Sequence, residues 1–418
     1  MPTKRDATPT SLDRSKIKVV LLEAIHPRAA ELFRSRGYTN VVEVAQAPAG
    51  AALGRAVADA HVVGIRSRTQ LTDEVLRSAD RLLAVGCFCI GTNQVALDAA
   101  RDRGVPVFNA PYSNTRSVAE LVVAEIVMLL RGIPERNALA HRGSWKKSLD
   151  GAREARGKTV GIVGYGHIGT QVGVLAEALG MRVVFHDIET KLALGNAASA
   201  KGLDDLLERS DVVTLHVPET ALTHRMIGAR QLARMREGAA LINASRGTVV
   251  DLDALAASLE SGRLRGAAID VFPAEPEAND QPFESPLLRF DNVLLTPHIG
   301  GSTVEAQENI GIEVAEKLIK YSDNGSTLTS VNFPEVALPE HAGKHRLLHV
   351  HRNQPGVLAQ VNEVFSRRGV NVAAQYLQTT SHIGYVVIDF DAGGRQGSLA
   401  LKREMAGVAG TIRTRILY

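Results

Sequence analysis

The segment from Val160 to Gly169 has the sequence VGIVGYGHIG, in which three glycines follow the spacing G-x-G-x-x-G. The apolar run Lys158–Gly164 predicts a buried parallel strand, and a helix is expected to follow it. Gly164 permits the tight turn, Gly166 lets a pyrophosphate approach the backbone, and Gly169 lets the helix pack on the sheet. The helix N-terminus would face the phosphates. The segment therefore predicts a dinucleotide-binding unit.

An acidic residue completes this fingerprint. The next apolar run, Arg182–His186, predicts a second strand, and Asp187 follows it directly. An acid at this place hydrogen-bonds a ribose 2′-hydroxyl and would repel the 2′-phosphate of NADP. The alternative is an ordinary surface acid after a strand. Because the strand, the glycines and the acid all occur in the required order, we predict NAD as the cofactor.

Short apolar runs alternate with helical spacing on both sides of this segment, which predicts doubly wound parallel sheets. The further strands predicted for this unit are Asp211–His216, Ala239–Asn243, Gly266–Asp270 and Asn292–Leu295. A first α/β unit is predicted from the runs Ile17–Glu23, His61–Arg66, Arg81–Gly86 and Val105–Asn109. Between the units, Ser117–Arg131 is apolar around much of its helical surface, so we expect it to be buried against another domain or subunit.

The C-terminal part has a different pattern. A helix is predicted from Thr303 to about Tyr321, and Ser322–Gly343, rich in Ser, Asn, Gly and Pro, predicts a linker. The predicted order from there is βαββαβ, which fits a small ferredoxin-like sandwich. Its elements are expected at Arg346–His351, Gly356–Arg368, Val370–Leu377, Gly384–Phe390, 396–406 and 411–418.

The composition excludes several other classes. The 418 residues carry a net charge of only +3, which argues against nucleic-acid or membrane binding. No apolar run is long enough for a membrane helix, and the polar start of the chain is expected to be a loose tail without a signal peptide. Cys87 and Cys89 are the only cysteines, so we expect a reducing cytoplasm and no metal site. We interpret both as packing residues.

Three further segments carry chemistry, and each follows a predicted strand, where ligands collect in such folds. They are NASRG (243–247), DVFPAEP (270–276) and TPHIGGS (296–302). Hydride transfer at C2 of a 2-hydroxy acid needs a guanidinium for the carboxylate, a histidine for the hydroxyl proton, and a carboxylate to orient the histidine. Arg246, His298 and Glu275 supply one of each, so we predict these three as the catalytic residues.

With these segments, Ile17–Tyr321 resembles the D-isomer-specific 2-hydroxyacid dehydrogenases. The resemblance implies that Arg246 binds and polarises the keto acid, that Glu275 pairs with His298, and that His298 is the proton donor. It also implies two Rossmann-like lobes, the NAD-binding lobe (114–300) being inserted into a substrate lobe (11–113 and 301–343), after a disordered tail at 1–10. The cofactor contacts that it implies are Gly164, Gly166, His167, Ile168, Gly169, Asp187, Ala244, Ser245, Arg246, Asp270, His298, Ile299, Gly300 and Gly301.

Within that family, two features resemble the short bacterial members that carry an ACT domain: the arginine segment after the second predicted strand, and the C-terminal module. Arg66, Ser67 and Arg68 follow a predicted strand and could clamp a phosphate, although two solvated arginines are the alternative. The loop CFCIGTNQ (87–94) replaces the R-x-G-x-G-x-D-N of many relatives, which leaves substrate details open. The resemblance implies NAD-dependent oxidation of D-3-phosphoglycerate, a phosphorylated hydroxy acid, to 3-phosphohydroxypyruvate, in the first step of L-serine synthesis.

Residues 344–418 resemble an ACT regulatory domain. The resemblance implies a homotetramer in which L-serine is a feedback inhibitor, bound by His351, Asn353 and Asn371 where two ACT domains meet. The alternative for Asn353 is a helix cap, and for His351 a surface residue. Two other functions stay open: a dehydrogenase for glycerate, lactate or another 2-oxo acid, including 2-oxoglutarate, and a dinucleotide-sensing regulator without catalysis.

Overall fold

The computed structural model describes residues 13–276, 281–339, 345–391 and 395–417. The tail expected at residues 1–10 lies outside them. The chain divides into two compact units, one formed by Met1–Ser113 with Gln307–Tyr418 and the other by Asn114–Ala306. The predicted limits of the three domains stay a prediction. No helix in the described part of the chain is both long and apolar enough to cross a membrane.

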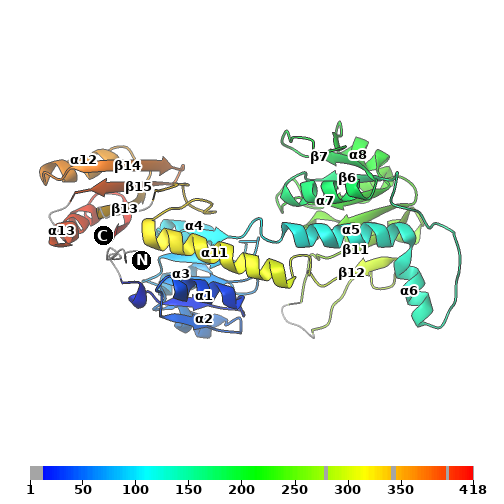
Figure 1. Cartoon of the computed structure of the whole chain (residues 1–418), viewed down its shortest axis with the longest axis horizontal. Helices are drawn as coiled ribbons and strands as arrows, with labels where there is room; N and C mark the ends of the chain where they lie inside the picture. The colour runs from blue at the N-terminus through cyan, green and yellow to red at the C-terminus, as the bar shows by residue number, and fades with distance from the viewer. Residues whose placement is uncertain (1–12, 277–280, 340–344, 392–394, 418) are drawn as a thin grey trace, which may run out of the picture. The chain divides into compact units, whose positions relative to one another are not determined.

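The N-terminal sheet of the first unit is parallel, with the strand order β2-β1-β3-β4-β5. Its strands are β1 (Val19–Leu21), β2 (Val41–Glu43), β3 (Val62–Ile65), β4 (Ala84–Cys87) and β5 (Val107–Asn109), and the helices between them are α1 (Pro27–Ser35), α2 (Gly50–Val57), α3 (Asp73–Ser78) and α4 (Leu97–Asp102). Figure 1 shows the helices of this part of the chain in blue to cyan. Apolar cores cover both faces of this sheet. The predicted doubly wound fold is therefore confirmed here.

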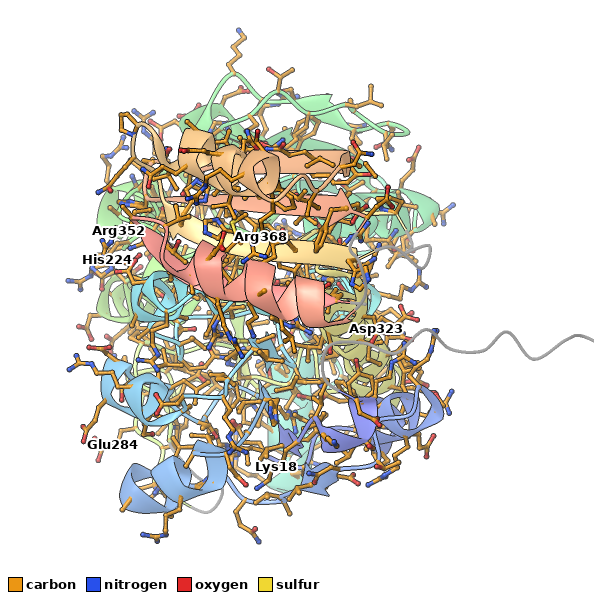
Figure 2. The ribbon with its side chains drawn as sticks, turned by 90° about the vertical axis from the view of Figure 1, so that its left-hand side faces the viewer. Lys18, His224, Glu284, Asp323, Arg352 and Arg368 are labelled. Atoms are coloured by element: carbon orange, nitrogen blue, oxygen red, sulfur yellow. The ribbon has the colours of Figure 1, made fainter. Side chains whose placement is uncertain are left out.

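A long helix, α11 (Val304–Asn324), packs on one face of that sheet through Val314 and Leu318. A Cβ on Gly86 of β4 would lie 2.7 Å from both side chains, so the glycine allows the helix to approach. Asp323, labelled in Figure 2, accepts hydrogen bonds from Arg14 (3.0 and 3.1 Å) and Tyr38 (2.8 Å). These contacts join the end of α11 to the start of the described chain.

The second unit contains a seven-stranded parallel sheet with the order β12-β11-β10-β9-β6-β7-β8. Its strands are β6 (Thr159–Val163), β7 (Arg182–His186), β8 (Ala198–Ser199), β9 (Val212–Leu215), β10 (Ala239–Asn243), β11 (Leu264–Ile269) and β12 (Val293–Leu295), and its helices are α5 (Thr115–Arg131), α6 (Ile133–His141), α7 (His167–Ala178), α8 (Leu203–Arg209), α9 (Ala229–Arg234) and α10 (Leu252–Glu260). This is the order of a dinucleotide-binding fold, which reverses direction between β6 and β9.

Helix α5 was expected to be buried against another domain or subunit. Its buried residues instead pack on its own unit, against α7, β10 and β11. The two short strands β2 and β8 were not predicted, because each lies at a sheet edge and is largely exposed. Every other strand of both parallel sheets was predicted from its apolar run.

The C-terminal part folds as the predicted βαββαβ sandwich. Its elements are β13 (His345–Arg352), α12 (Val357–Arg367), β14 (Val372–Thr379), β15 (Ile383–Phe390), α13 (Arg395–Ala406) and β16 (Thr411–Leu417). The antiparallel sheet has the order β14-β15-β13-β16, and both helices pack on one of its faces. Arg368, labelled in Figure 2, lies at the end of α12 and pairs with Glu404 on α13.

The predicted linker at Ser322–Gly343 is wrong for most of its described residues. The segment after α11 is packed: the Thr327 hydroxyl donates to the Pro334 carbonyl at 2.6 Å, and the Val331 amide donates to Val107 of β5 at 2.9 Å. Apolar side chains of this segment, Phe333 among them, also pack on the second face of the C-terminal sheet. The polar composition was misleading because polar groups such as the Thr327 hydroxyl are buried and hydrogen-bonded within the fold.

Candidate active site

The glycine loop joins β6 to α7 at the point where the strand order reverses, and its three glycines meet different needs. Gly164 has φ +90, and a Cβ there would lie 2.6 Å from the His216 carbonyl oxygen. A Cβ on Gly169 would lie 2.2 Å from the Gly164 carbonyl oxygen, so this glycine lets α7 pack closely. Gly166 has nothing within 4 Å of its Cβ position. The open backbone at Gly166 and the N-terminus of α7, which has no side-chain cap, fit a pyrophosphate.

Asp187 lies beside this loop, directly after β7. Its carboxylate accepts hydrogen bonds from the backbone amides of Tyr165 (2.8 Å) and Glu189 (3.0 Å). These bonds fix the carboxylate next to the loop and leave lone pairs for a ribose hydroxyl.

The NASRG segment, at the end of β10, is organised by a buried side chain. The side-chain Oδ1 of Asn243 accepts bonds from the Ser245 amide (3.1 Å) and hydroxyl (2.8 Å), and its Nδ2 donates to the Arg246 carbonyl at 3.0 Å. Arg246 Nη1 donates to the Ser245 carbonyl at 2.7 Å. The guanidinium therefore stands on a rigid turn while it remains partly exposed.

Gly247 brings this turn against the DVFPAEP segment. A Cβ on Gly247 would lie 2.0 Å from the Phe272 carbonyl carbon, so only glycine allows the two backbones to approach. The Phe272 amide in turn donates to Glu275 Oε1 at 3.1 Å, which holds the carboxylate. The positive charge of Arg246 acts to lower the pKa of both Glu275 and His298.

The TPHIGGS segment is held by Asp270, which follows β11 and is only 2% exposed. Its carboxylate accepts hydrogen bonds from the Thr296 hydroxyl (2.6 Å), the Ile299 amide (2.8 Å) and the Gly300 amide (2.8 Å). His298, between these contacts, has φ +55, which is uncommon outside glycine. A strained residue persists where its surroundings fix it, and such residues cluster at functional sites.

His298 and Glu275 form a direct pair. His298 Nδ1 lies 2.9 and 3.1 Å from the two Glu275 carboxylate oxygens. This bond raises the pKa of His298 above its ordinary value, against the opposing effect of burial. Burial acts to raise the pKa of Glu275, but the bond and charge of His298, the Phe272 amide and Arg246 hold that pKa below its ordinary value. Because Nδ1 is engaged, Nε2 is the ring nitrogen available for proton exchange with a substrate.

The arginines predicted for the substrate phosphate lie in the other unit, in the loop after β3. Arg66 is partly buried, and Ser67 and Arg68 are exposed. Glu23, a buried acid that sequence reasoning missed, accepts bonds from the amides of Arg66 (3.0 Å), Arg68 (3.0 Å) and Thr69 (2.9 Å). The backbone of the loop is therefore fixed while two guanidinium groups extend from it. The sequence signal that could have identified Glu23 is its position at the end of the first predicted strand.

The predicted effector residues lie in the C-terminal sandwich. His351 on β13 is 4% exposed and stacks on His349 with ring centroids 5.3 Å apart. Asn353 donates to the Thr380 carbonyl at 2.8 Å, and α12 begins at Val357 without a side-chain cap. The alternatives of a capping role for Asn353 and a surface position for His351 are therefore wrong. Asn371 is exposed just before β14.

Comparisons with known proteins agree with this geometry. Residues 123–300 match the family model "D-isomer specific 2-hydroxyacid dehydrogenase, NAD binding domain", and residues 347–413 match "AHAS small subunit-like ACT domain". A solved D-lactate dehydrogenase from Aquifex aeolicus, complexed with NAD and lactic acid, is 26% identical with a TM-score of 0.67 over 76% of this chain and 100% of that one. TT0316 of Thermus thermophilus is 32% identical with a TM-score of 0.64, over 72% and 96% of the two chains.

The chain belongs to the D-isomer-specific 2-hydroxyacid dehydrogenases, the NAD-dependent oxidoreductases that this fold and this Arg–Glu–His cluster define, and it carries a C-terminal ACT domain. Its relatives narrow the class further. D-3-phosphoglycerate dehydrogenase of Escherichia coli is 60% identical over 98% of this chain and 99% of the relative. Enzymes of the same name are 57% identical in Haemophilus influenzae and 46% identical in Dictyostelium discoideum, with the same coverage.

Proposed function

We propose that the protein oxidises D-3-phosphoglycerate to 3-phosphohydroxypyruvate with NAD, the first step of L-serine synthesis. The observation that carries this proposal is the His298–Glu275 pair in the field of Arg246, in a unit with a complete dinucleotide loop. The relatives named D-3-phosphoglycerate dehydrogenase support the choice of substrate. A cytoplasmic location belongs to the same proposal.

The chain's own groups would divide the work as follows. Arg246 binds the substrate carboxylate, and His298 Nε2 takes the proton of the C2 hydroxyl. Glu275 stabilises the imidazolium that forms, since the bond between them already raises the pKa of His298. NAD, when bound, accepts the hydride that leaves C2. In the reverse direction His298 returns the proton to the carbonyl oxygen.

The cofactor contacts follow from the same geometry. The glycine loop and the N-terminus of α7 would hold the pyrophosphate, with His167 and Ile168 in the first turn of the helix. Asp187 would bind the ribose hydroxyl. Ala244 and Ser245, Asp270, and the turn from His298 to Gly301 would line the nicotinamide end.

The substrate phosphate would be held by Arg66, Ser67 and Arg68. The carboxylate of Glu23 fixes the backbone of this loop, so the guanidinium groups are presented from a defined position. Replacing Arg68 with Gln should raise KM for 3-phosphohydroxypyruvate at least about tenfold and change KM for pyruvate little. An equal effect on both substrates would show that Arg68 contacts something other than the phosphate.

The ACT domain would bind L-serine through His351, Asn353 and Asn371 and inhibit the enzyme. The domain contacts the substrate part of its unit directly: Tyr385 donates to the Gly325 carbonyl at 2.6 Å and Arg413 to the Leu82 carbonyl at 2.5 Å. Such contacts can transmit a difference in serine affinity between active and inactive states. We also propose that the protein is a homotetramer. Analytical ultracentrifugation with and without serine measures the number of subunits.

The test of the proposed function is NADH oxidation with a set of keto acids. We expect 3-phosphohydroxypyruvate to exceed pyruvate, hydroxypyruvate and 2-oxoglutarate in kcat/KM, and His298→Ala to lower kcat by about 10²–10⁴-fold. Preference for an unphosphorylated keto acid would assign the chain to another activity of its family. NADH binding without turnover of any keto acid would favour a dinucleotide-sensing regulator.

A further inference from the structure

One buried acid of the second unit has no part in the chemistry described above. Glu125 lies in the middle of α5 and is 1% exposed. Neither of its carboxyl oxygens has a hydrogen-bond partner among the described residues. An ionised carboxylate without a partner in an apolar interior is very unfavourable, whereas the neutral acid costs much less. The position of Glu125 therefore favours its protonated form.

Glu125 belongs to the buried face of α5, and that face packs on an apolar core. The inner face of α5 packs on β10, β11 and α7 through a core that includes Val122, Ile126 and Ile242. Burial, and secondly the charge of Asp270, raise the pKa of Glu125 to about 8. The strand β10 has no ionisable side chain. The ionisable groups of α5, α6, α7 and β11 do not contribute to this shift: Arg116, Glu120, Arg131, Glu135, Arg136, His141, His167, Glu177 and Arg265.

Asp270 links Glu125 to the catalytic histidine. Its carboxylate holds the turn on which His298 adopts φ +55, through Thr296, Ile299 and Gly300. Helix α5 also lies along this turn, because a Cβ on Gly300 would lie 3.4 Å from Val118. A second negative charge on Glu125 would repel the Asp270 carboxylate in a medium of low dielectric constant.

We propose that Glu125 is a positioning residue of the active site: as an uncharged acid near Asp270, it allows a single carboxylate to hold the turn that carries His298. The proposal rests on the role proposed above for His298. Its consequence is that loss of the Glu125 proton loosens the turn and lowers catalysis, although Glu125 contacts neither substrate nor cofactor.

The direction of the assay separates this effect from the titration of His298. In oxidation of the hydroxy acid, His298 must be unprotonated, so its own titration can only increase the rate as the pH rises. We therefore expect the wild type to lose activity above the pKa of Glu125, about tenfold per pH unit. Glu125→Gln keeps the shape and cannot ionise, so its profile should rise to a plateau up to pH 10. Glu120→Gln, an exposed change on the same helix, should leave the wild-type profile unchanged.

A second measurement does not depend on turnover. A protonated carboxylic acid gives its own infrared carbonyl band, and the wild type should lose one such band between pH 7 and 10 that Glu125→Gln lacks at every pH. This band tests Glu125 even if the chain proves inactive on D-3-phosphoglycerate, or if the Gln variant is too unstable for kinetics, in which case Glu125→Met replaces it in the spectra. An alkaline limb that persists in Glu125→Gln, or no such band at pH 7, would overturn the proposal.

Discussion

The pair of His298 and Glu275 gives the most direct prediction. Glu275→Gln removes the negative charge but keeps an oxygen that can accept the bond from Nδ1. The pKa of His298 should fall because the bond and charge of Glu275 are what raise it. Proton donation by His298 during keto-acid reduction should then be lost at a lower pH than in the wild type.

The size of the shift follows from the distance and the exposure. Nδ1 lies 2.9 Å from Glu275 Oε2, and the two side chains are 52% and 38% exposed. Two unit charges about 4 Å apart interact by about 1 kcal/mol in water and about 4 kcal/mol near a protein surface. Exposure to solvent keeps the net value near the lower limit. One pKa unit corresponds to about 1.4 kcal/mol, so we expect a downward shift of about one unit.

The assay is the pH dependence of kcat/KM for 3-phosphohydroxypyruvate with NADH, at constant ionic strength. The apparent pKa of the decrease at high pH should fall by about one unit, so the rate at a given pH above it should fall about tenfold. Glu260→Gln, at an exposed Glu that pairs with Arg289, is the matched control and should move nothing. An unchanged or higher apparent pKa in Glu275→Gln would refute the assignment of this pair.

Four further predictions follow from single contacts. The native enzyme should prefer NAD over NADP by at least about tenfold in kcat/KM, and Asp187→Ser should reduce that ratio, because the acid repels a 2′-phosphate; equal use of both cofactors by the native enzyme would contradict this. Gly247→Ala should lower the free energy of unfolding by about 2 kcal/mol or more in a denaturant titration, whereas Gly202→Ala, where a Cβ has open space, should be tolerated. Glu125→Gln should gain about 3–5 kcal/mol of stability relative to the wild type as the pH rises from 4.5 to 8, since the unfolded acid releases its proton near 4.5 and the folded one near 8; parallel stability curves would exclude a buried proton. Asn353→Ala should raise the serine concentration for half-inhibition about tenfold, and unchanged inhibition would move the effector site elsewhere.

Local patterns in the sequence predicted most of this fold. A buried parallel strand needs a short apolar run whatever surrounds it, so β6, β7 and β10 could be located from their own residues. Strands at a sheet edge lack that signal, which is why β2 and β8 were missed. The linker prediction was wrong for the opposite reason. Polar residues such as Thr327 indicated an exposed segment, but the Thr327 hydroxyl bonds to Pro334 within the segment and the Val331 amide bonds to Val107 of β5.

The candidate site shows the same division between local and distant information. The fingerprint glycines and the strand ends that carry Arg246, Glu275 and His298 have local signals, so the sequence could nominate them. The requirement for glycine at position 247 has no local signal, because it arises from the backbone of Phe272, which is distant in the sequence. The role of Asp270 in fixing the turn also depends on a contact between two strand ends.

The sequence places Glu125 on the buried side of α5, but it does not indicate what a buried acid does there. Val118, Val122, Glu125 and Leu129 follow the spacing of one helical face, so the sequence already places this acid on the buried stripe of α5. Pattern alone treats such an acid as an exposed residue in an otherwise apolar helix, because an unpaired carboxylate is almost never fully buried. The structure resolves the conflict by giving it apolar neighbours and a second carboxyl, that of Asp270. An acid in that setting can stay in the core as long as it keeps its proton, and the dependence of catalysis on that proton is what the alkaline limb of the oxidation reaction would measure.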